Sequence, residues 1–354
     1  MAPLVSPTFW RGRRVFLTGH TGFKGGWLAL LLEHLGAVVT GYAIDVPTTP
    51  SFYESARVAE GIESVTGDIR VVAAVTRAME QARPQVVFHL AAQSLVRRSH
   101  EEPVETFTTN VLGTANVLEA VRGVDGIRSV VVATSDKCYR RSNTAHSEDD
   151  PLGGEDPYSA SKAAAELVTA AYRDSYFLAD GPALATVRAG NVIGGGDWAR
   201  DRLVPDVMRA ALDGGTVIVR NPGHVRPWQH VLGPLSGYLG LAERLEADRG
   251  FATAWNFGPA EDDARPVESI VDALVERWPT TVAISVEDDS GGAREADALR
   301  LDSSRARELL GWRTWPLDTA LDATAEWYRA FAAGEDVRSV ALAQIARYEA
   351  DMSR

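Results

Sequence analysis

Three lysines mark the residues of this chain that could do chemistry. They are Lys24, Lys137 and Lys162, and the other basic residues among the 36 lysines and arginines are all arginines. An amine is compact and can be tuned to lose its proton, whereas a guanidinium stays charged. Lys162 follows Tyr158 by four residues, so a helix would place both on one face. Because an adjacent ammonium favours a phenolate, the pair predicts a proton-transfer site.

A glycine-rich loop follows the first apolar run of the chain, residues 14–18. Gly19, Gly22 and Gly25 are spaced as G-x-x-G-x-x-G, and an apolar helical segment begins directly behind them. Glycines let the backbone approach a pyrophosphate closely, and a helix N-terminus offers it free N–H groups. Asp45 ends the next apolar run, where a carboxylate accepts ribose hydroxyls and repels a 2′-phosphate. The pattern predicts a dinucleotide site that takes NAD rather than NADP.

Three further residues end apolar runs or lie near this loop. Asp68 ends the third run, where it reaches the adenine edge of a dinucleotide or caps the following helix. Ser135 ends the fifth run, where its hydroxyl would hydrogen-bond a substrate hydroxyl held beside Tyr158. Lys24 either takes part in the site directly or lies exposed on the loop.

Apolar runs and helical segments alternate along the first half of the chain. The runs cover residues 14–18, 38–44, 62–66, 86–90, 129–133 and 183–188. The helical segments between them include residues 27–32, 71–82, 110–121 and 158–178. This order predicts an α/β fold, a doubly wound parallel sheet of the Rossmann type, with its chemistry beyond the carboxyl ends of the strands.

The pattern changes after Gly190, where a loop-like glycine run and shorter elements richer in Pro, Trp and Arg follow. We therefore expect residues 1–190 to form an NAD-binding Rossmann domain. Residues 191–354 are expected to form mainly a smaller substrate-binding region, with a helix near residues 317–333. Whether segments of the second part also belong to the first domain stays open.

Composition disfavours several classes of partner. A net charge of −12 and a pI near 5.1 argue against nucleic acid, because no basic stripe offsets the acidity. The seven histidines are scattered and Cys138 is the single cysteine, so neither a metal site nor an internal disulfide is expected. No apolar run approaches membrane-spanning length, and the N-terminus is unlike a signal peptide. Because one cysteine fits a reducing compartment, we expect a cytoplasmic protein with no membrane partner.

Four longer motifs carry a resemblance to a known family. They cover residues 18–25, 134–139, 188–198 and 226–231. With Tyr158 and Lys162, they are similar to the extended short-chain dehydrogenase/reductase family over nearly the whole chain. Within it they resemble the CDP-glucose 4,6-dehydratases, since Ser135-Asp136-Lys137 stands where related dTDP-glucose enzymes carry Thr-Asp-Glu. One departure is Arg294-Glu295-Ala296, where related enzymes often have His-Glu-Ala, and it leaves the far end of the substrate pocket undefined.

The resemblance implies an NAD-dependent dehydration of CDP-D-glucose to CDP-4-dehydro-6-deoxy-D-glucose. Tyr158 takes the proton of the sugar 4-hydroxyl while hydride leaves carbon 4 for NAD. The new ketone acidifies the hydrogen on carbon 5, water leaves across carbons 5 and 6, and hydride returns to carbon 6. Asp136 is assigned as the acid and Lys137 as the base, because burial raises the pKa of a carboxyl and lowers that of an amine. The reverse assignment and a structural Asp136–Lys137 ion pair stay open.

The resemblance also implies the residues of each subsite. The catalytic set is Ser135, Asp136, Lys137, Tyr158 and Lys162. The cofactor set is Gly19, His20, Thr21, Gly22, Phe23, Gly25, Asp45, Asp68, Ile69, Ala91, Tyr158 and Lys162. The substrate set, for the nucleotide diphosphate and its neighbourhood, is Asn191, Arg202, Arg220, Arg226 and Asn256. Trp228 and His230 are expected to pack the pocket wall, and helices near residues 105–123 and 158–178 to pair in a homodimer.

Two other functions fit parts of the pattern. A nucleotide-sugar 4-epimerase needs Ser135, Tyr158 and Lys162 but no acid/base pair for water loss, so Asp136 and Lys137 argue against it. A non-catalytic NAD-sensing protein would keep the glycine loop without Tyr158 and Lys162. The identities of the nucleotide and the sugar rest on the resemblance alone, so a 4,6-dehydratase for another nucleotide sugar stays open.

Overall fold

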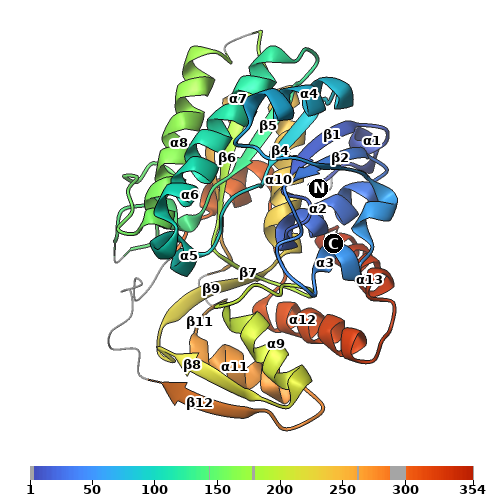
Figure 1. Cartoon of the computed structure of the whole chain (residues 1–354), viewed down its shortest axis with the longest axis vertical. Helices are drawn as coiled ribbons and strands as arrows, with labels where there is room; N and C mark the ends of the chain where they lie inside the picture. Colours follow the sequence, from blue (N-terminus) through green and yellow to red (C-terminus); the bar gives the residue numbers. More distant parts are fainter. Residues whose placement is uncertain (1–3, 143, 178–179, 261–262, 288–299, 354) are drawn as a thin grey trace.

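A seven-stranded parallel sheet forms the larger part of the molecule (Figure 1). The computed structural model describes residues 4–142, 144–177, 180–260, 263–287 and 300–353. Across the sheet the strands run in the order β3-β2-β1-β4-β5-β6-β10. Their bounds are β1 (Arg14–Thr18), β2 (Val38–Ala43), β3 (Glu63–Thr66), β4 (Val86–His89), β5 (Ser129–Ala133), β6 (Ala183–Ala189) and β10 (Ala254–Phe257). The first six strands have the order of a doubly wound Rossmann sheet, so the predicted fold class is confirmed.

Helices cover both faces of this sheet (Figure 1). One face carries α4 (Val72–Ala82), α7 (Gly113–Gly123) and α8 (Pro157–Ser175), and the other carries α2 (Phe23–His34) and α10 (Leu232–Ala247). The side chains of β1 alternate between the two cores: Phe16 faces the first, and Val15 and Leu17 face the second. Because both faces are buried, the strands are continuous apolar runs in the sequence.

The strand order reverses between β1 and β4, which places a crevice at their carboxyl ends. The glycine loop leads from β1 into α2 at this edge, and residues 90–95 follow β4. The short helix η3 (Asp136–Cys138) follows β5 at the same edge. Segments far apart in the sequence that carry candidate site residues therefore meet at one edge of the sheet.

The chain after residue 190 contributes to both parts of the molecule. β10 extends the main sheet beside β6, and α10 packs against β5 and β6. The smaller part, below the main sheet in Figure 1, contains a three-stranded sheet in the order β11-β9-β7 and the parallel pair β8 and β12. These strands are β7 (Asn191–Ile193), β8 (Thr216–Arg220), β9 (Val225–His230), β11 (Ala264–Pro266) and β12 (Ala283–Glu287).

The remaining helices surround these sheets. With the smaller part lie α9 (Leu203–Asp213), α11 (Val267–Glu276) and α12 (Leu317–Ala332). The others are α1 (Pro7–Trp10), α3 (Phe52–Ser55), α5 (Val96–Glu101), α6 (Pro103–Phe107), α13 (Val337–Met352) and the short helices η1 (Val58–Gly61), η2 (Thr108–Leu112), η4 (Arg249–Phe251) and η6 (Ala306–Leu310). Among the described residues, no helix has the length and apolarity to cross a membrane, and no group of three His, Cys, Asp or Glu side chains could hold a metal.

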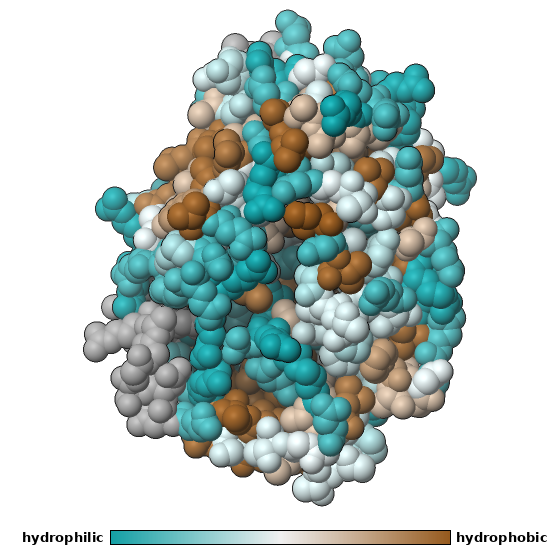
Figure 2. Space-filling view, viewed as in Figure 1, coloured by the Kyte–Doolittle hydropathy of each residue, from teal (hydrophilic) through white to brown (hydrophobic). Residues whose placement is uncertain are grey.

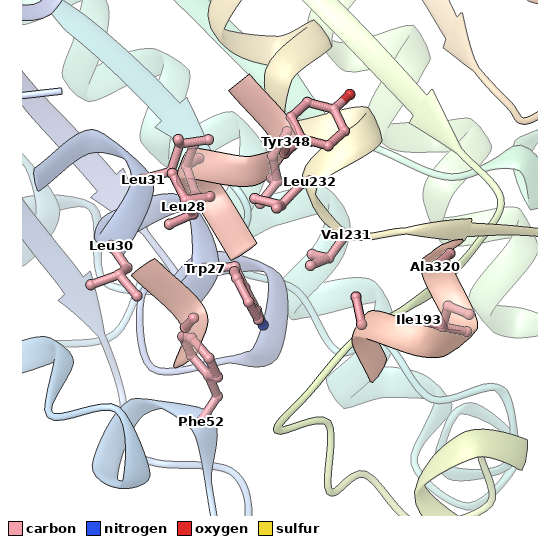
Figure 3. Packing of buried hydrophobic residues seen from close by; sticks show 14 of the residues in the cluster. Trp27, Leu28, Leu30, Leu31, Phe52, Ile193, Val231, Leu232, Ala320 and Tyr348 are labelled. Carbon is pink, nitrogen blue, oxygen red and sulfur yellow. The ribbon is translucent and has the colours of Figure 1, made fainter. Parts of the chain in front are cut away.

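One apolar cluster ties α2 to the smaller part of the molecule (Figure 3). Trp27 on α2 stacks on Phe52 with ring centroids 4.7 Å apart, and its Nε1–H donates to the Gly195 carbonyl at 2.9 Å. Leu28 and Leu31 of α2, Ile193, Val231, Leu232, Ala320 and Tyr348 belong to the same cluster. Helix α2 is thus buried along most of its length, which fixes the glycine loop at its N-terminus.

Candidate active site

The glycine loop has the form of a dinucleotide cradle. Gly19 has a φ of +79°, and a Cβ there would lie 2.8 Å from the Ala91 nitrogen, so internal packing alone requires glycine. Gly22, the N-cap of α2, has a φ of −77°, and a Cβ there would meet nothing closer than the Gly19 oxygen at 3.4 Å. A ligand that approaches the Gly22 backbone closely would account for this glycine. The loop therefore fits a pyrophosphate bound at the N-terminus of α2.

Two predicted cofactor residues, Asp45 and Asp68, follow β2 and β3. Asp45 is exposed, and its carbonyl accepts the Thr21 hydroxyl at 2.5 Å. Asp68 is not the N-cap of α4, because Val71 occupies that position. Its carboxylate instead accepts the Arg70 backbone N–H at 2.8 Å and pairs with the Arg70 guanidinium, which holds the pKa of Asp68 below its usual value.

The other cofactor residues lie around the same loop with different exposure. His20 is buried, its Nε2 shares a hydrogen bond with the Ser64 hydroxyl at 2.7 Å, and burial lowers its pKa to about 4. Its imidazole is therefore neutral and is used in packing against the sheet. Ile69 is buried, whereas Phe23 and Ala91 are half-buried.

Ser135, Asp136 and Tyr158 form one hydrogen-bonded group at the carboxyl end of β5. The Ser135 and Tyr158 side chains share a hydrogen bond, and the Ser135 hydroxyl donates to Asp136 Oδ1 at 3.0 Å. The Lys137 backbone N–H donates to Ser135 Oγ at 3.2 Å, which caps η3. This cap fixes the start of η3 and thereby holds Asp136 and Lys137 beside Tyr158.

Asp136 has an environment that raises its pKa. It is 4% exposed, and its Oδ2 has no hydrogen-bond partner among the described residues. This oxygen lies 3.2 Å from where a Cβ on Gly190 would stand, so glycine leaves room for the carboxyl there. Burial raises the pKa of Asp136 and outweighs the opposing charges of Lys137, Lys24 and Arg226. A carboxyl with a raised pKa and one oxygen left without a partner can present its proton to a ligand.

Lys162 and Lys24 face this region from α8 and α2. Lys162 Nζ donates to the Ala133 carbonyl at 3.3 Å, and burial, with the Lys24 charge second, lowers its pKa to about 8. Burial, followed by the Arg202 charge, likewise lowers the pKa of Lys24 to about 8. Lys24 is half-buried, so the structure excludes the alternative that it lies exposed on the loop.

Tyr158 differs from the expectation in the direction of its pKa. Burial raises the pKa of Tyr158 and outweighs the Ser135 hydrogen bond and the charges of Lys137 and Arg202, which lower it. The Lys162 ammonium, which was expected to favour the phenolate, donates to the backbone of β5 instead. The cations that favour ionisation of Tyr158 in this structure are therefore Lys137 and Arg202.

Arginines of the smaller part face the same edge of the sheet. Arg202 donates to Asp197 Oδ2 at 3.1 Å and to Ser94 Oγ at 3.2 Å, so it bridges the smaller part and the loop after β4. Arg226 is 8% exposed and its charge acts on Asp136. In the space-filling view a hollow opens between the two parts, with mostly hydrophilic residues around it (Figure 2).

Most other predicted substrate residues lie on β7, β8 and β9. Asn191 begins β7, is half-buried and pairs in register with Trp228 of β9. Arg220 ends β8 and forms an ion pair with Asp201 at 3.6 Å. Trp228 and His230 are both buried, as a packing role requires. The segment Arg294-Glu295-Ala296 lies outside the described residues.

Asn256 is not brought into this group. It is fully buried in β10, and the Tyr139 hydroxyl donates to its Oδ1 at 2.7 Å. Its Nδ2 donates to the carbonyls of His146 at 2.9 Å and Asp302 at 3.1 Å. Because both amide hydrogens are already used inside the core, the structure does not support the predicted substrate contact of Asn256.

Comparison with known proteins decides the family. A family model described as GDP-mannose 4,6 dehydratase matches residues 16–317. The chain belongs to this family. It is 47% identical over 360 residues to the CDP-glucose 4,6-dehydratase of Salmonella typhimurium, covering 99% of this chain and 100% of that protein. It is also 30% identical over 324 residues to the UDP-glucose 4-epimerase of Mycolicibacterium smegmatis, covering 89% of this chain and 98% of that protein.

Solved structures of related enzymes share the fold of this dehydratase family member. MoeE5 in complex with UDP-glucuronic acid and NAD is 27% identical, with a TM-score of 0.75 over 90% of this chain and 99% of that chain. The NAD complex of the Brucella ovis UDP-glucose 4-epimerase is 25% identical, with a TM-score of 0.76 over 90% of this chain and 98% of that chain. The predicted family, fold class and enzyme class, a 4,6-dehydratase, are therefore confirmed.

A buried ion pair that the sequence analysis missed supports the catalytic edge of this dehydratase. The guanidinium of Arg188 on β6 donates to both carboxylate oxygens of Glu166 on α8, at 2.8 and 2.9 Å. Glu166 also accepts the hydroxyls of Thr134 at 2.5 Å and Thr186 at 2.7 Å. Because Thr134 directly precedes Ser135, this pair holds the end of β5. An arginine inside the apolar run 183–188 is the only signal in the sequence that could have indicated it.

A second network that was not predicted links the loop after β4 to the turn of α8 that carries Tyr158. Asn110 Nδ2 donates to Ser161 Oγ at 2.8 Å and to the Gln93 carbonyl at 2.9 Å. The Ser161 hydroxyl in turn donates to the Tyr158 carbonyl at 2.7 Å. Asn110 lies in the π-helical turn η2, where the regular helix pattern is interrupted, and local periodicity does not indicate such a turn.

Proposed function

We propose that this chain is an NAD-dependent CDP-glucose 4,6-dehydratase that forms CDP-4-dehydro-6-deoxy-D-glucose. The observation that carries the proposal is the buried Asp136, whose Oδ2 has no hydrogen-bond partner among the described residues, beside Lys137 within the Ser135–Tyr158 group. Loss of water needs an acid and a base beyond the residues that oxidise carbon 4, and Asp136 and Lys137 supply them. The 47% identity over the full length of a CDP-glucose 4,6-dehydratase supports the nucleotide and the sugar.

The proposed proton transfers follow from the positions of these side chains. The glycine loop would hold NAD, which would supply the hydride acceptor for carbon 4 of the sugar and the hydride donor for carbon 6. Tyr158 removes the proton of the sugar 4-hydroxyl, with the Ser135 hydroxyl holding that oxygen. Lys137 removes the proton from carbon 5 and returns it there when hydride reaches carbon 6, and Asp136 protonates the departing 6-hydroxyl. Lys162 and the Gly22 backbone would hold the ribose and pyrophosphate of the cofactor.

Arginines are proposed to hold the diphosphate of the nucleotide sugar. Arg202 and Arg226 lie next to the catalytic group, and guanidinium forks match phosphate oxygens in pairs. Arg220, paired with Asp201 on the smaller part, is proposed to contact the ribose or the base. The chain is acidic overall, but these cations make the proposed substrate site locally positive, as an anionic substrate requires.

A product assay tests the proposed function. The purified protein is incubated with CDP-glucose without added NADH, and the nucleotide sugar is analysed by mass spectrometry and NMR. We expect a 4-keto-6-deoxy product at many turnovers with no net accumulation of NADH. Turnover of UDP-glucose, dTDP-glucose or GDP-mannose, but not CDP-glucose, would replace the proposed substrate. Interconversion of 4-epimers without loss of water would replace dehydration by epimerisation.

The proposal includes a homodimer formed through α6, η2 and α8. Apolar side chains are exposed there, with Val104 at 76%, Leu112 at 52% and Leu167 at 62%, and apolar residues gather over these helices in Figure 2. A groove of about 430 Å³ lined by Phe107 and its neighbours runs along the same face. An exposed apolar patch of this kind is typical of a protein–protein interface.

A cytoplasmic location is also proposed, because the single Cys138 is a free thiol. Detection of the protein outside the cytoplasm by cell fractionation would contradict this location.

If the dimer forms through this face, a charge introduced there should disrupt it. Leu167→Glu places a carboxylate in the apolar interface and is expected to convert the protein to a monomer in size-exclusion chromatography with light scattering. Ile218→Glu, which changes another exposed apolar residue on β8, is the control and should leave the dimer intact. A monomeric parent protein, or dissociation by both variants alike, would contradict the assignment of this face.

A further inference from the structure

Lys24 has no role in the proposed reaction, yet it occupies the centre of the site. It lies in the first turn of α2, where the helix dipole disfavours a cation and which itself contains no acidic residue. Its ammonium is half-buried and makes no hydrogen bond or close ion pair with any residue that the structure describes. Withdrawing an ammonium from water costs free energy unless an anion pairs with it.

The groups that act on Lys24 come from four different elements of the site. Two are cations, Arg202 before α9 and Lys162 on α8, and two are anions, Asp136 on η3 and Asp197 in the loop before Arg202. Asp197 is already hydrogen-bonded to Arg202 at 3.1 Å, and Asp136 Oδ2 has no hydrogen-bond partner. Lys24, Lys162 and Arg202 therefore face one space from both parts of the molecule, with more positive charge than the protein itself balances.

We propose that the Lys24 ammonium binds a diphosphate of a bound nucleotide in the space between the N-terminus of α2 and Arg202. Two ligands of the reaction carry this group, the dinucleotide cofactor on the glycine loop and the nucleotide sugar at Arg202. The assignment to the nucleotide sugar rests on the proposed function, whereas the assignment to the cofactor does not. A phosphate oxygen there would accept from Lys24 and screen its repulsion from Arg202 and Lys162.

The chemistry of lysine fits this position better than that of arginine. Arg202 already offers a planar fork, and its second nitrogen is bonded to Ser94. A compact ammonium with three donors can contact one phosphate oxygen while leaving Asp136 Oδ2 free to act on the sugar. Lys24 would therefore be a binding residue that adjoins the catalytic group without taking part in proton transfer.

The test compares the parent protein with Lys24→Met, which keeps the length of the side chain, and Lys24→Arg, which keeps its charge. NADH binding is measured by fluorescence, and nucleoside diphosphate binding by calorimetry with whichever of CDP, UDP, dTDP and GDP the parent binds most tightly. We expect Lys24→Met to weaken one of the two ligands by roughly tenfold to a hundredfold, the range of a charge-assisted hydrogen bond. Lys24→Arg is expected to retain most of that affinity.

The ligand that loses affinity identifies the source of the diphosphate. Unchanged affinity for both ligands in Lys24→Met would overturn the proposal. Because Lys24 has no hydrogen-bond partner among the described residues and is repelled by Arg202 and Lys162, Lys24→Met should leave the Tm of the nucleotide-free protein unchanged or higher. A lowered Tm together with equal loss of both ligands would indicate a structural role and overturn the proposal as well. If the parent binds a nucleoside diphosphate other than CDP, the proposed substrate fails while the Lys24 test stands.

Discussion

Replacement of Asp136 by asparagine is expected to lower the turnover number for dehydration by about 10²–10⁴-fold. Asparagine keeps the size of the side chain and can still accept from the Ser135 hydroxyl, but it cannot give a proton to the departing 6-hydroxyl. Oxidation at carbon 4 does not use this proton, so the reduced cofactor should accumulate on the variant. Product formation by mass spectrometry and NADH absorbance of the enzyme–substrate mixture measure the two steps separately.

Lys137→Met is the matched variant for the base. If Lys137 removes the proton from carbon 5, this variant loses exchange of that hydrogen with deuterated solvent, whereas Asp136→Asn retains it. Exchange lost in Asp136→Asn and retained in Lys137→Met would reverse the two roles. If both variants turn over nearly as fast as the parent protein, Asp136 and Lys137 form only a structural ion pair. That result would contradict the proposed elimination.

The pH dependence of turnover separates the two assignments independently. Burial raises the pKa of Asp136, so its protonated form persists to higher pH than in an exposed carboxyl. As an acid, Asp136 is active below this pKa, and turnover falls as the pH rises through it. As a base, it is active above this pKa, and turnover falls as the pH drops through it. Asp136→Asn should remove whichever limb belongs to this residue.

Much of the fold was predictable because its strands are buried on both faces. Runs such as residues 14–18 and 129–133 are continuous apolar segments that end in polar motifs, and the structure contains both as strands. β10 was not predicted, because the four residues of this strand follow a region of mixed polar and apolar character. Its place beside β6 depends on a contact between residues about 70 apart in the chain, and local periodicity carries no information on such pairs.

The site was predictable to the extent that motifs end strands or share a helix face. Ser135 and Asp136 follow β5, Tyr158 lies on α8, and the structure joins all three by hydrogen bonds. The hydrogen bonds of Asn256 inside the core and the half-burial of Lys24 were not predictable from spacing. Each depends on side-chain direction: the Asn256 amide turns into the core, and the Lys24 side chain is partly withdrawn from solvent.

The buried pair of Glu166 and Arg188 carries the largest expected effect on stability. Glu166→Gln leaves the Arg188 guanidinium in the core without its counter-charge, and breaking such a pair costs about 3–5 kcal/mol. Burial raises the pKa of Glu166, but the bonds and charge of Arg188 outweigh it and keep the pKa below its usual value, so the carboxylate is ionised at neutral pH. Chemical denaturation followed by circular dichroism measures the change in the free energy of unfolding.

Glu60→Gln is the control, because Glu60 pairs with Arg57 at 3.3 Å on the surface, where side chains are 46% and 62% exposed. It should change the free energy of unfolding by less than about 1 kcal/mol. Glu166→Gln should also lower turnover in the protein that remains folded, because Glu166 holds Thr134 next to Ser135. Arg188 also donates hydrogen bonds to the Tyr139 hydroxyl and the Glu148 carbonyl. Equal stability of the two variants would mean that these bonds are enough to hold the guanidinium in the core.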